Sequence, residues 1–375
     1  MYVGGVDSMQ VATVYRCVKV ISDGVASLPL RYMTLQGGRY VEDVRSPFHY
    51  LLTVQPQPEM SAYDFWAHAV TLMLLEGNAY IFPRYVLGEL TDLVLCHKGT
   101  VSHDILNSKY IISDSYNGIF GTFDESEVVH LYLHSCDGRR GESVIDHARR
   151  TLGIAVAGDN ETEKRFTNGG TVRGFVTNDK AVTGFGKVQD DELSNLATSL
   201  DDQFVGGKRI VSLPGDSDFK QISLSSTDMQ FLETRKFTVR EICRFFGVPT
   251  SYVFDDNATN YKSAEMANLT FLTMTLDPIL KRIENELRRK LIPRSQCCRQ
   301  TFQYDRSDIY SLDLQSKAAY YKQMLEIGAM TANEIRHKEN LPEVDGGDTP
   351  LVSANLLPLD TIREAKGVTG VKSEE

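Results

Sequence analysis

The chain has 375 residues, a length that corresponds to two or three domains. Apolar residue types make up 42% and charged types 24%, which excludes a disordered chain, a collagen-like fibre and a coiled-coil rod. No apolar run approaches the ~18 residues that a membrane span needs, and the first residues lack the pattern of a signal peptide. We therefore expect a soluble protein that stays in the cytoplasm in which it is made.

The charge balance bears on nucleic-acid binding. The 40 Lys and Arg residues are outnumbered by 50 Asp and Glu residues, and the formal net charge is −10. Proteins that grip nucleic acid by neutralising phosphates are basic at least locally. When the sequence is divided into four blocks, only residues 225–300 are net basic, with twelve basic and nine acidic side chains. This balance argues against tight, sequence-specific DNA binding but allows passing contact with DNA.

The first 150 residues alternate between amphipathic helices and short strands, which predicts an α+β domain. Apolar residues recur every three or four positions over 9–28 and again over 61–76, where Ser61 and Asp64 supply a helix cap. Shorter β-rich segments broken by Gly and Asp follow. We expect strands around the Gly37-Gly38 turn and at 79–85, 90–95, 109–112 and 128–133.

Two long helices flank a compact insert in the middle of the chain. The first helix is expected from about 143 to 166. The second is expected from 225 to 246, where Gly247 and Pro249 stop it. Residues 171–224 between them predict a small α/β module. Its expected elements are strands at 171–177 and 209–213 and a helix at 190–204.

A polar loop within 251–262 precedes another long helix, which we expect over 263–291. Pro278 lies inside this helix and is expected to kink its axis. Beyond it we expect a strand at 301–304, a helix at 314–327 and a short helix opened by the capping box of Thr331 and Glu334.

No motif of a known catalytic or nucleotide-binding site stands in the sequence. The glycine doublets match neither a Walker A loop nor a dinucleotide fingerprint, and Arg209 occupies the Ser/Thr position that a Walker A loop needs after Lys208. No G-x-S-x-G, H-E-x-x-H or paired-carboxylate pattern occurs in a sequence setting that indicates a catalytic site. The six cysteines form no C-x-x-C pair and are expected to be reduced. We expect a protein that is not an enzyme and that uses no cofactor.

His130, His134 and Cys136 lie within seven residues and suggest a metal site. On an extended strand these positions spread over about 13–20 Å, whereas zinc ligands lie ~2.0–2.3 Å from the ion. We therefore expect ordinary strand positions and no metal site. Asp255 and Asp256 could bind a cation in a loop, but carboxylates that are merely solvated are far more common.

Lys236, Arg240 and Arg244 recur every four residues and form one basic stripe along the helix at 225–246. Two interpretations stay open. In the first, the stripe is a solvated or subunit-facing helix surface. In the second, it faces DNA or another partner.

Several local strings, in the order in which they occur, resemble the HK97-type portal proteins of tailed bacteriophages. The strongest are REICRFFGVP at 240–249 and TANEIR at 331–336. The others are YRCV at 15–18 with ASLPL at 26–30, EGNAY at 76–80, DGRRGES at 137–143 and FTNGG at 166–170. Their shared order over most of the chain makes the resemblance specific.

The resemblance implies a portal fold of the α+β class that assembles as a dodecameric ring at one capsid vertex. DNA is packaged and ejected through such a ring. The parts that the resemblance assigns are a wing at 1–150 and 263–312, stem helices at 151–170 and 225–250, an α/β clip insert at 171–224, a tunnel loop at 251–262, and a helical crown with a C-terminal tail at 313–375.

The resemblance also implies the partners. These are further copies of the chain, non-specifically contacted double-stranded DNA, the terminase large subunit, a head–tail connector or adaptor, and the major capsid protein. The protein would be assembled in the host cytoplasm, reside in the virion and contact no membrane. The tunnel-loop residues expected to contact DNA are Asn257, Thr259, Asn260, Tyr261 and Lys262.

The residues themselves agree with this picture, because a conduit should not hold DNA tightly and the chain is acidic overall. Two alternatives remain. One is a monomeric metal-dependent enzyme that uses His130, His134 and the loop around Asp255. The other is a structural adaptor without DNA passage.

Overall fold

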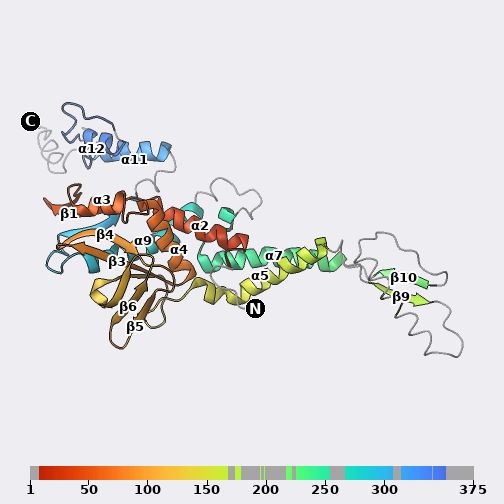
Figure 1. Ribbon diagram of the computed structural model, residues 1–375. Helices are drawn as coiled ribbons and strands as arrows, with labels where there is room; N and C mark the ends of the chain where they lie inside the picture. Colours follow the sequence, from red (N-terminus) through yellow and green to blue (C-terminus); the bar gives the residue numbers. More distant parts are fainter. Residues whose placement is uncertain are drawn as a thin grey trace, which may run out of the picture. The chain divides into compact units, whose positions relative to one another are not determined.

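The computed structural model describes residues 8–167, 174–178, 217–221, 225–253, 267–306, 314–339 and 341–351, together with Asn195 and Thr198 (Figure 1). The chain divides into two compact units, Met1–Tyr304 and Asp305–Glu375. Every strand of the described residues lies in the first unit, and the named elements of the second are helices. This mixture is the α+β class that the sequence predicts. Among the described residues, no helix is both long and apolar enough to cross a bilayer.

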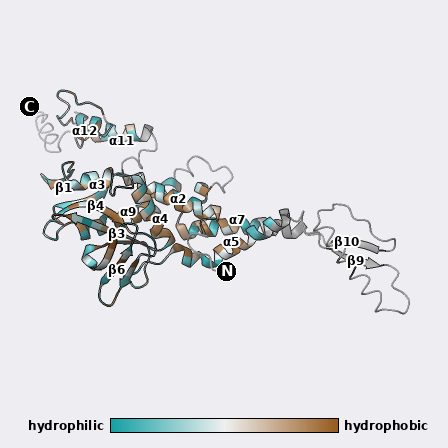
Figure 2. Ribbon diagram, in the orientation of Figure 1, coloured by the Kyte–Doolittle hydropathy of each residue, from teal (hydrophilic) through white to brown (hydrophobic). Residues whose placement is uncertain are grey.

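Two packed helices, α2 and α4, form part of the core of the first unit. α2 (Ala12–Ala26) buries residues at the predicted three- and four-residue spacing, among them Val14, Val18 and Ile21. α2 packs against α4 (Ala62–Leu75), whose eight buried residues make it one of the most hydrophobic segments in Figure 2. The hydrophobic effect therefore holds both helices in the interior.

The predicted cap of α4 is present. Ser61 Oγ accepts a hydrogen bond from the backbone N of Asp64 at 3.2 Å. The chain leaves the helix at Gly77, whose positive φ of 80° brings its backbone within reach of the loop at 141–143. A Cβ at Gly77 would lie 2.6 Å from a backbone carbon of Glu142, so this close approach requires glycine.

One three-stranded antiparallel sheet joins segments that are far apart in the sequence. β1 (Leu30–Gln36) forms the predicted hairpin with β2 (Arg39–Glu42), and β11 (Gln300–Tyr304) pairs with the other edge of β1. Aromatic rings from β1, β11 and α3 (Pro47–Thr53) pack with centroids between 5.0 and 5.5 Å apart. The sequence did not predict α3.

Two further three-stranded antiparallel sheets have the strand orders β4-β3-β8 and β5-β6-β7. The strands of the first are β3 (Asn78–Val86), β4 (Glu89–Leu95) and β8 (Val129–Tyr132). The strands of the second are β5 (Val101–Asp104), β6 (Lys109–Asp114) and β7 (Ile119–Asp124). The sheets share a hydrophobic cluster that includes Val94, Val128, Tyr110 and Ile112. The sequence predicted β3, β4, β6 and β8 but missed β5 and β7.

α5 (Val144–Thr167) and α7 (Ser225–Phe246) lie side by side and antiparallel (Figure 1). An ion pair between Asp159 of α5 and Arg235 of α7 joins them. The predicted stop after α7 is confirmed, since Gly247 has a φ of 67°.

Part of the insert between these helices is described. β9 (Gly174–Asn178) pairs antiparallel with β10 (Ser217–Gln221). β9 overlaps the strand predicted at 171–177, and β10 was not predicted. The strand predicted at 209–213 lies outside the described residues, and so does the helix predicted at 190–204, apart from the helical residues Asn195 and Thr198.

The irregularity expected at Pro278 takes the form of a widened turn just before it. η3 (Leu272–Leu276) is a π-helix that leads into α9 (Asp277–Leu291), with Pro278 in the first turn of α9. Because proline has no backbone N–H, the carbonyl four residues earlier loses its usual donor. The N–H of Asp277 donates to the carbonyl of Leu272, five residues back, which is the π-helical pattern.

The second unit contains α11 (Leu314–Glu326) and α12 (Ala332–Lys338). The predicted capping box of α12 is present. Thr331 Oγ1 accepts from the N of Glu334 at 3.2 Å, and Glu334 Oε2 accepts from the N of Thr331 at 3.1 Å.

His130 on β8 is buried, and both of its ring nitrogens are hydrogen bonded. Nδ1 lies 3.0 Å from Tyr110 Oη, and Nε2 lies 2.8 Å from Asn78 Oδ1. The amide oxygen can only accept, so Nε2 carries the proton and Nδ1 accepts from the tyrosine hydroxyl. Burial lowers the pKa of His130 to about 3.

We expect His130 to make the fold less stable in acid. In the unfolded chain its pKa is about 6.5, so below that pH the unfolded chain binds a proton that the folded chain binds only near pH 3. The contribution of neutral His130 is complete above pH 6.5. It falls by up to about 1.4 kcal/mol per pH unit as the pH decreases toward 3. Urea unfolding at pH 7.5 and pH 5.5 measures this effect. From pH 7.5 to pH 5.5, the free energy of unfolding should decrease less for His130→Gln than for wild type. Equal decreases would contradict the buried, neutral state assigned to His130.

Candidate functional site

The residues predicted to contact DNA fall on two segments. The tunnel-loop residues Asn257, Thr259, Asn260, Tyr261 and Lys262 lie outside the described residues, as do Asp255 and Asp256. The basic stripe of Lys236, Arg240 and Arg244 lies on α7, within the described part of the chain. The geometry of the site therefore rests on the stripe and on the residues that flank the loop.

The three side chains of the basic stripe are exposed. None of them forms a hydrogen bond or ion pair with another described residue, whereas the neighbouring Arg235 is paired with Asp159. Arg244 lies in the last turn of α7, where a cation stabilises the negative end of the helix dipole. The helix dipole therefore gives a structural reason for the charge of Arg244. Lys236 and Arg240 lie farther from the helix end and remain available to a partner.

Described residues at the start of the predicted tunnel loop and just after its end are tied together. Tyr252 Oη donates to Asn268 Oδ1 at 2.8 Å, and the rings of Tyr252 and Phe271 pack with centroids 4.9 Å apart. Arg16 Nε on α2 donates to the carbonyl of Tyr252 at 2.9 Å. Both ends of the loop are thus anchored to the core of the first unit. We call these four residues the loop base.

The stripe and the loop base border the same groove. Arg240 and Arg244 line a groove of about 510 Å³ together with Thr250, Phe271 and Met274. Met274 is 76% exposed. The structure therefore brings the C-terminal half of the stripe against the segments that carry the predicted loop, a proximity that the four-residue spacing on α7 does not reveal.

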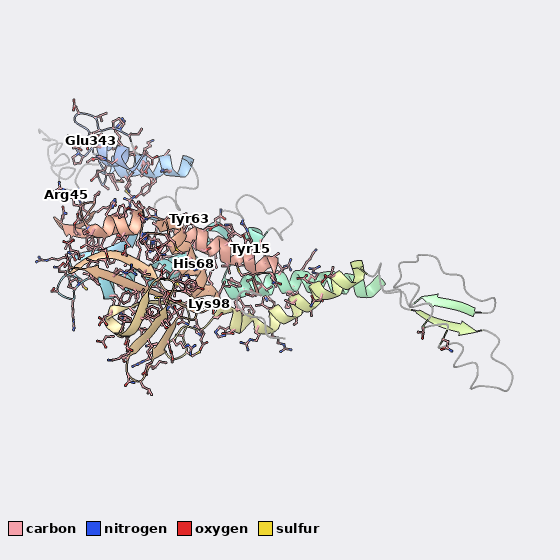
Figure 3. All side chains as sticks on the ribbon, in the orientation of Figure 1. Tyr15, Arg45, Tyr63, His68, Lys98 and Glu343 are labelled. Carbon is pink, nitrogen blue, oxygen red and sulfur yellow. The ribbon has the colours of Figure 1, made fainter. Side chains whose placement is uncertain are left out.

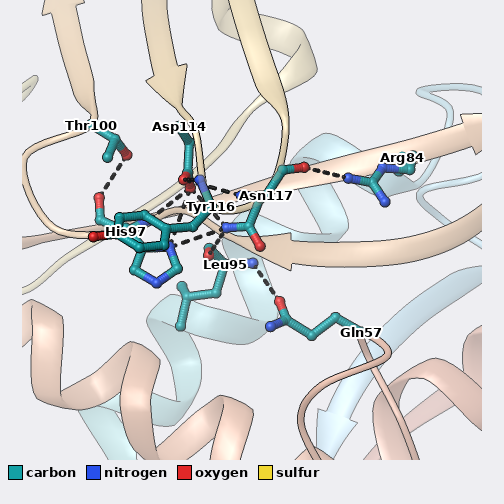
Figure 4. Close-up of polar contacts among 8 residues, drawn as sticks. All are labelled: Gln57, Arg84, Leu95, His97, Thr100, Asp114, Tyr116 and Asn117. Atoms are coloured by element: carbon teal, nitrogen blue, oxygen red, sulfur yellow. Dashed lines mark hydrogen bonds and ion pairs between the residues drawn. The ribbon is translucent and has the colours of Figure 1, made fainter.

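Asp114 and His97 form the arrangement that most resembles an active-site pair, because a buried carboxylate beside a histidine often has a catalytic role. Asp114 Oδ2 accepts from the backbone N of His97 at 3.0 Å and from Asn117 Nδ2 at 2.8 Å (Figure 4). Burial raises the pKa of Asp114, but these hydrogen bonds outweigh burial and the net pKa is lowered. Asn117 Nδ2 also donates to the carbonyl of Leu95 at 3.2 Å. The carboxylate therefore ties the turn between β6 and β7 to the end of β4, which is a structural role.

The three residues considered for a metal site do not share a strand. β8 ends at Tyr132, so the chain is not extended through His134 and Cys136, and the distance argument made from an extended strand does not hold there. Cys136 Sγ lies 3.9 Å from His134 Nε2. His130 is separate from this pair, since its ring is engaged by Tyr110 and Asn78.

Two residues that the sequence analysis missed lie beside His134. Glu142 follows the loop after β8, and His147 lies in the first turns of α5. The donor atoms of His134, Glu142 and His147 are all within 4.8 Å of one another. The spacing H-x-C-x5-E-x4-H could have revealed the group. All six cysteines are free in the structure.

Comparison with known proteins identifies the family. A family model described as "Phage portal protein" matches residues 12–340. The portal protein of Enterobacteria phage HK97 is 31% identical over 360 residues, which cover 94% of this chain and 83% of that protein. The probable portal protein of Streptomyces phage phiC31 is 28% identical over 366 residues, covering 93% and 79% of the two chains.

Solved structures show the same fold. A chain in the virion of a native gene transfer agent particle has a TM-score of 0.59 at 21% identity and covers 91% of this chain and 94% of that one. An HK97-family phage portal protein from Corynebacterium diphtheriae has a TM-score of 0.58 at 14% identity, with coverages of 82% and 96%.

The chain belongs to the phage portal protein family. The resemblance stated from the sequence strings is thereby confirmed, and so is the portal fold of the α+β class. Portal proteins are structural, which agrees with the expectation that the chain is not an enzyme.

Proposed function

We propose that twelve copies of this portal protein form a ring at one capsid vertex and that double-stranded DNA passes through its channel during packaging and ejection. The observation that carries the proposal is the exposed basic stripe on α7 beside the loop base, in a chain of the phage portal family. Such a ring resides in the virion after assembly in the host cytoplasm.

In this proposal the wing comprises 1–150 and 263–312, the stem 151–170 and 225–250, and the crown with its tail 313–375. The antiparallel pairing of α5 and α7 supports the stem assignment, because such a pair can carry the residues between its helices away from the wing. The clip at 171–224 is then the surface that meets the terminase large subunit and later the head–tail connector. The major capsid protein surrounds the ring.

The charges suit a channel in which DNA slides. A subunit with a net charge of −10 does not hold DNA through extensive release of counterions. Lys236, Arg240 and Arg244 offer a few exposed cations, and contacts to phosphates carry no sequence information. The energy for packaging comes from the terminase, since no catalytic step is assigned to this chain.

The first prediction that follows from the proposed function concerns assembly. The purified wild-type protein should form rings with a central channel, visible by electron microscopy and by light scattering. Deleting 171–224 should abolish stable rings, because a 54-residue clip has little core of its own and gains stability from neighbouring copies. A wild-type monomer of 42.1 kDa would contradict the proposed ring. Normal rings from the deletion variant would contradict the clip assignment.

The second prediction concerns the tunnel loop. Replacing residues 257–260 by glycine and serine should leave ring assembly intact, because the loop base lies outside the replaced segment. DNA packaging or retention should decrease, because polar side chains that contact the passing phosphates are removed. The DNA content of purified particles is the measurement. Full-length DNA at normal yield would show that the loop is a plain surface segment.

The third prediction concerns the basic stripe. Replacing Lys236, Arg240 and Arg244 together by glutamine should weaken non-specific DNA binding by assembled rings. The slope of log affinity against log salt should become shallower by about 0.9 for each phosphate that the variant no longer neutralises. Fluorescence anisotropy with a duplex of random sequence, measured at several salt concentrations, provides both values.

A matched control removes the same charge elsewhere. Arg45, Arg294 and Lys338 are exposed and lie outside α7, and Arg45 is labelled in Figure 3. Their triple glutamine variant should retain the wild-type salt slope. Loss of rings with unchanged DNA binding in the stripe variant would instead identify the stripe as a contact between subunits.

A further inference from the structure

We propose that His134, Cys136, Glu142 and His147 form a binding site for a borderline divalent transition-metal ion, with Zn²⁺ as the leading candidate. We call this group the HCEH cluster. The inference is independent of the proposed passage of DNA, because it rests on side chains at the base of α5 and on metal–ligand chemistry.

The donor atoms of the HCEH cluster are spaced as a small metal ion requires. Four-coordinate zinc holds donors ~2.0–2.3 Å from the ion, which places neighbouring donors about 3.3–3.8 Å apart. His147 Nε2 lies 3.0 Å from Glu142 Oε2, and Cys136 Sγ lies 3.9 Å from His134 Nε2. The donors of His134, Glu142 and His147 lie within 4.8 Å of one another. The donors of His134, Glu142 and His147 are therefore spaced for one ion, and Cys136 Sγ, which lies beside His134 but outside this mutually close group, would join them as the fourth ligand.

The backbone between the donors is already folded for this arrangement. The N–H of Glu142 donates to the carbonyl of His134 at 2.9 Å, which closes the loop from 134 to 142. Inside the loop, Asp137 Oδ1 accepts from the backbone N of Arg139 at 2.7 Å and from that of Arg140 at 2.8 Å. Residues that are ordered before the ion binds lose less conformational entropy on binding.

Gly141 ties this loop to the body of the first unit. Its backbone N donates to Asn78 Oδ1 at 2.7 Å, and its carbonyl accepts from Asn78 Nδ2 at 2.9 Å. A Cβ at Gly141 would lie 2.1 Å from the carbonyl oxygen of Gly77, so no side chain fits at this contact. His134 and Glu142 are thus presented from a fixed loop, and His147 from a helix.

The donor types select the ion. Two imidazoles, one thiolate and one carboxylate suit Zn²⁺ and chemically similar ions such as Co²⁺, whereas Mg²⁺ and Ca²⁺ prefer oxygen ligands alone. The side chains of Glu142 and His147 are 36% and 46% exposed, so an ion can enter from solvent.

A simple surface ion pair is the competing explanation of the His147–Glu142 contact. Such a pair needs only two residues and contributes little to stability. It gives no reason for a second imidazole, His134, with its ring centroid 5.6 Å from that of His147. A bound ion would join all four and would fasten the end of β8 to the start of α5.

Titration with Co²⁺ tests the site on the full-length protein after treatment with a chelator. Tetrahedral Co²⁺ with a thiolate ligand gives visible d–d bands and a sulfur-to-metal charge-transfer band. We expect one Co²⁺ per chain, displaced by Zn²⁺. His147→Ala should weaken binding about tenfold or more, since even changes outside the ligand shell have effects of 10- to 100-fold. Cys136→Ser should remove the charge-transfer band.

Two matched controls are available in the chain. His337 is an exposed histidine that lies 2.6 Å from the carboxylate of Glu343, which is labelled in Figure 3, and it repeats the His–Glu contact without a cluster. Cys298 is another exposed free cysteine. His337→Ala and Cys298→Ser should retain wild-type Co²⁺ binding and spectra. Circular dichroism confirms that each variant is folded.

Three outcomes would overturn the proposal. They are no bound Co²⁺ in the folded wild-type protein, equal binding by His147→Ala and His337→Ala, and a wild-type spectrum without a thiolate charge-transfer band. The last of these would show that Cys136 is not a ligand.

Discussion

The pairing of β1 with β11 is the interaction on which the first unit depends. It joins Leu30 to Tyr304 across the whole length of the unit. Closing a long stretch of chain costs entropy, and here the pairing is reinforced by the packing of α9 against β11 and β8. The segment from β3 to α9, which contains α5 and α7, therefore begins and ends within the same folded unit. Within the same unit, Arg16 of α2 donates a hydrogen bond to the carbonyl of Tyr252.

Charged and ionisable side chains of the first unit occur in two different environments, buried and exposed. Two buried ionisable groups of the first unit illustrate this: His130 is neutral with both ring nitrogens hydrogen bonded, and the Asp114 carboxylate accepts several hydrogen bonds. The stripe on α7 differs, since its cations are exposed and have no partner among the described residues. The buried groups stabilise the fold, whereas the exposed cations of the stripe are free to make weak contacts. The proposed channel would use both, because its walls would be rigid and its contacts with DNA weak.

The loop after β8 shows how a family feature and a feature of this chain share one segment. The DGRRGES string, at 137–143, carries the resemblance to portal proteins. Its aspartate folds the turn, and Gly141 makes the close contact with Gly77. That turn returns Glu142 to His134 and leads to His147 one helical turn into α5. The HCEH cluster thus uses a turn that is built for structural reasons.

The sequence by itself determined most elements and the family. The spacing of apolar residues located α2, α4 and α9, the Ser61 and Thr331 caps marked the starts of α4 and α12, and Gly247 marked the end of α7. These signals are local, so they can be read along the chain. β5 and β7 were missed because short strands depend on their partners. The proximity of the stripe to the loop base was decided by the tertiary structure alone, whereas the HCEH cluster has a local spacing in the sequence and needs the turn after β8 to bring its donors together. Both bring together residues whose distance in space is set by long-range pairing and by a turn, which no periodicity in the sequence encodes.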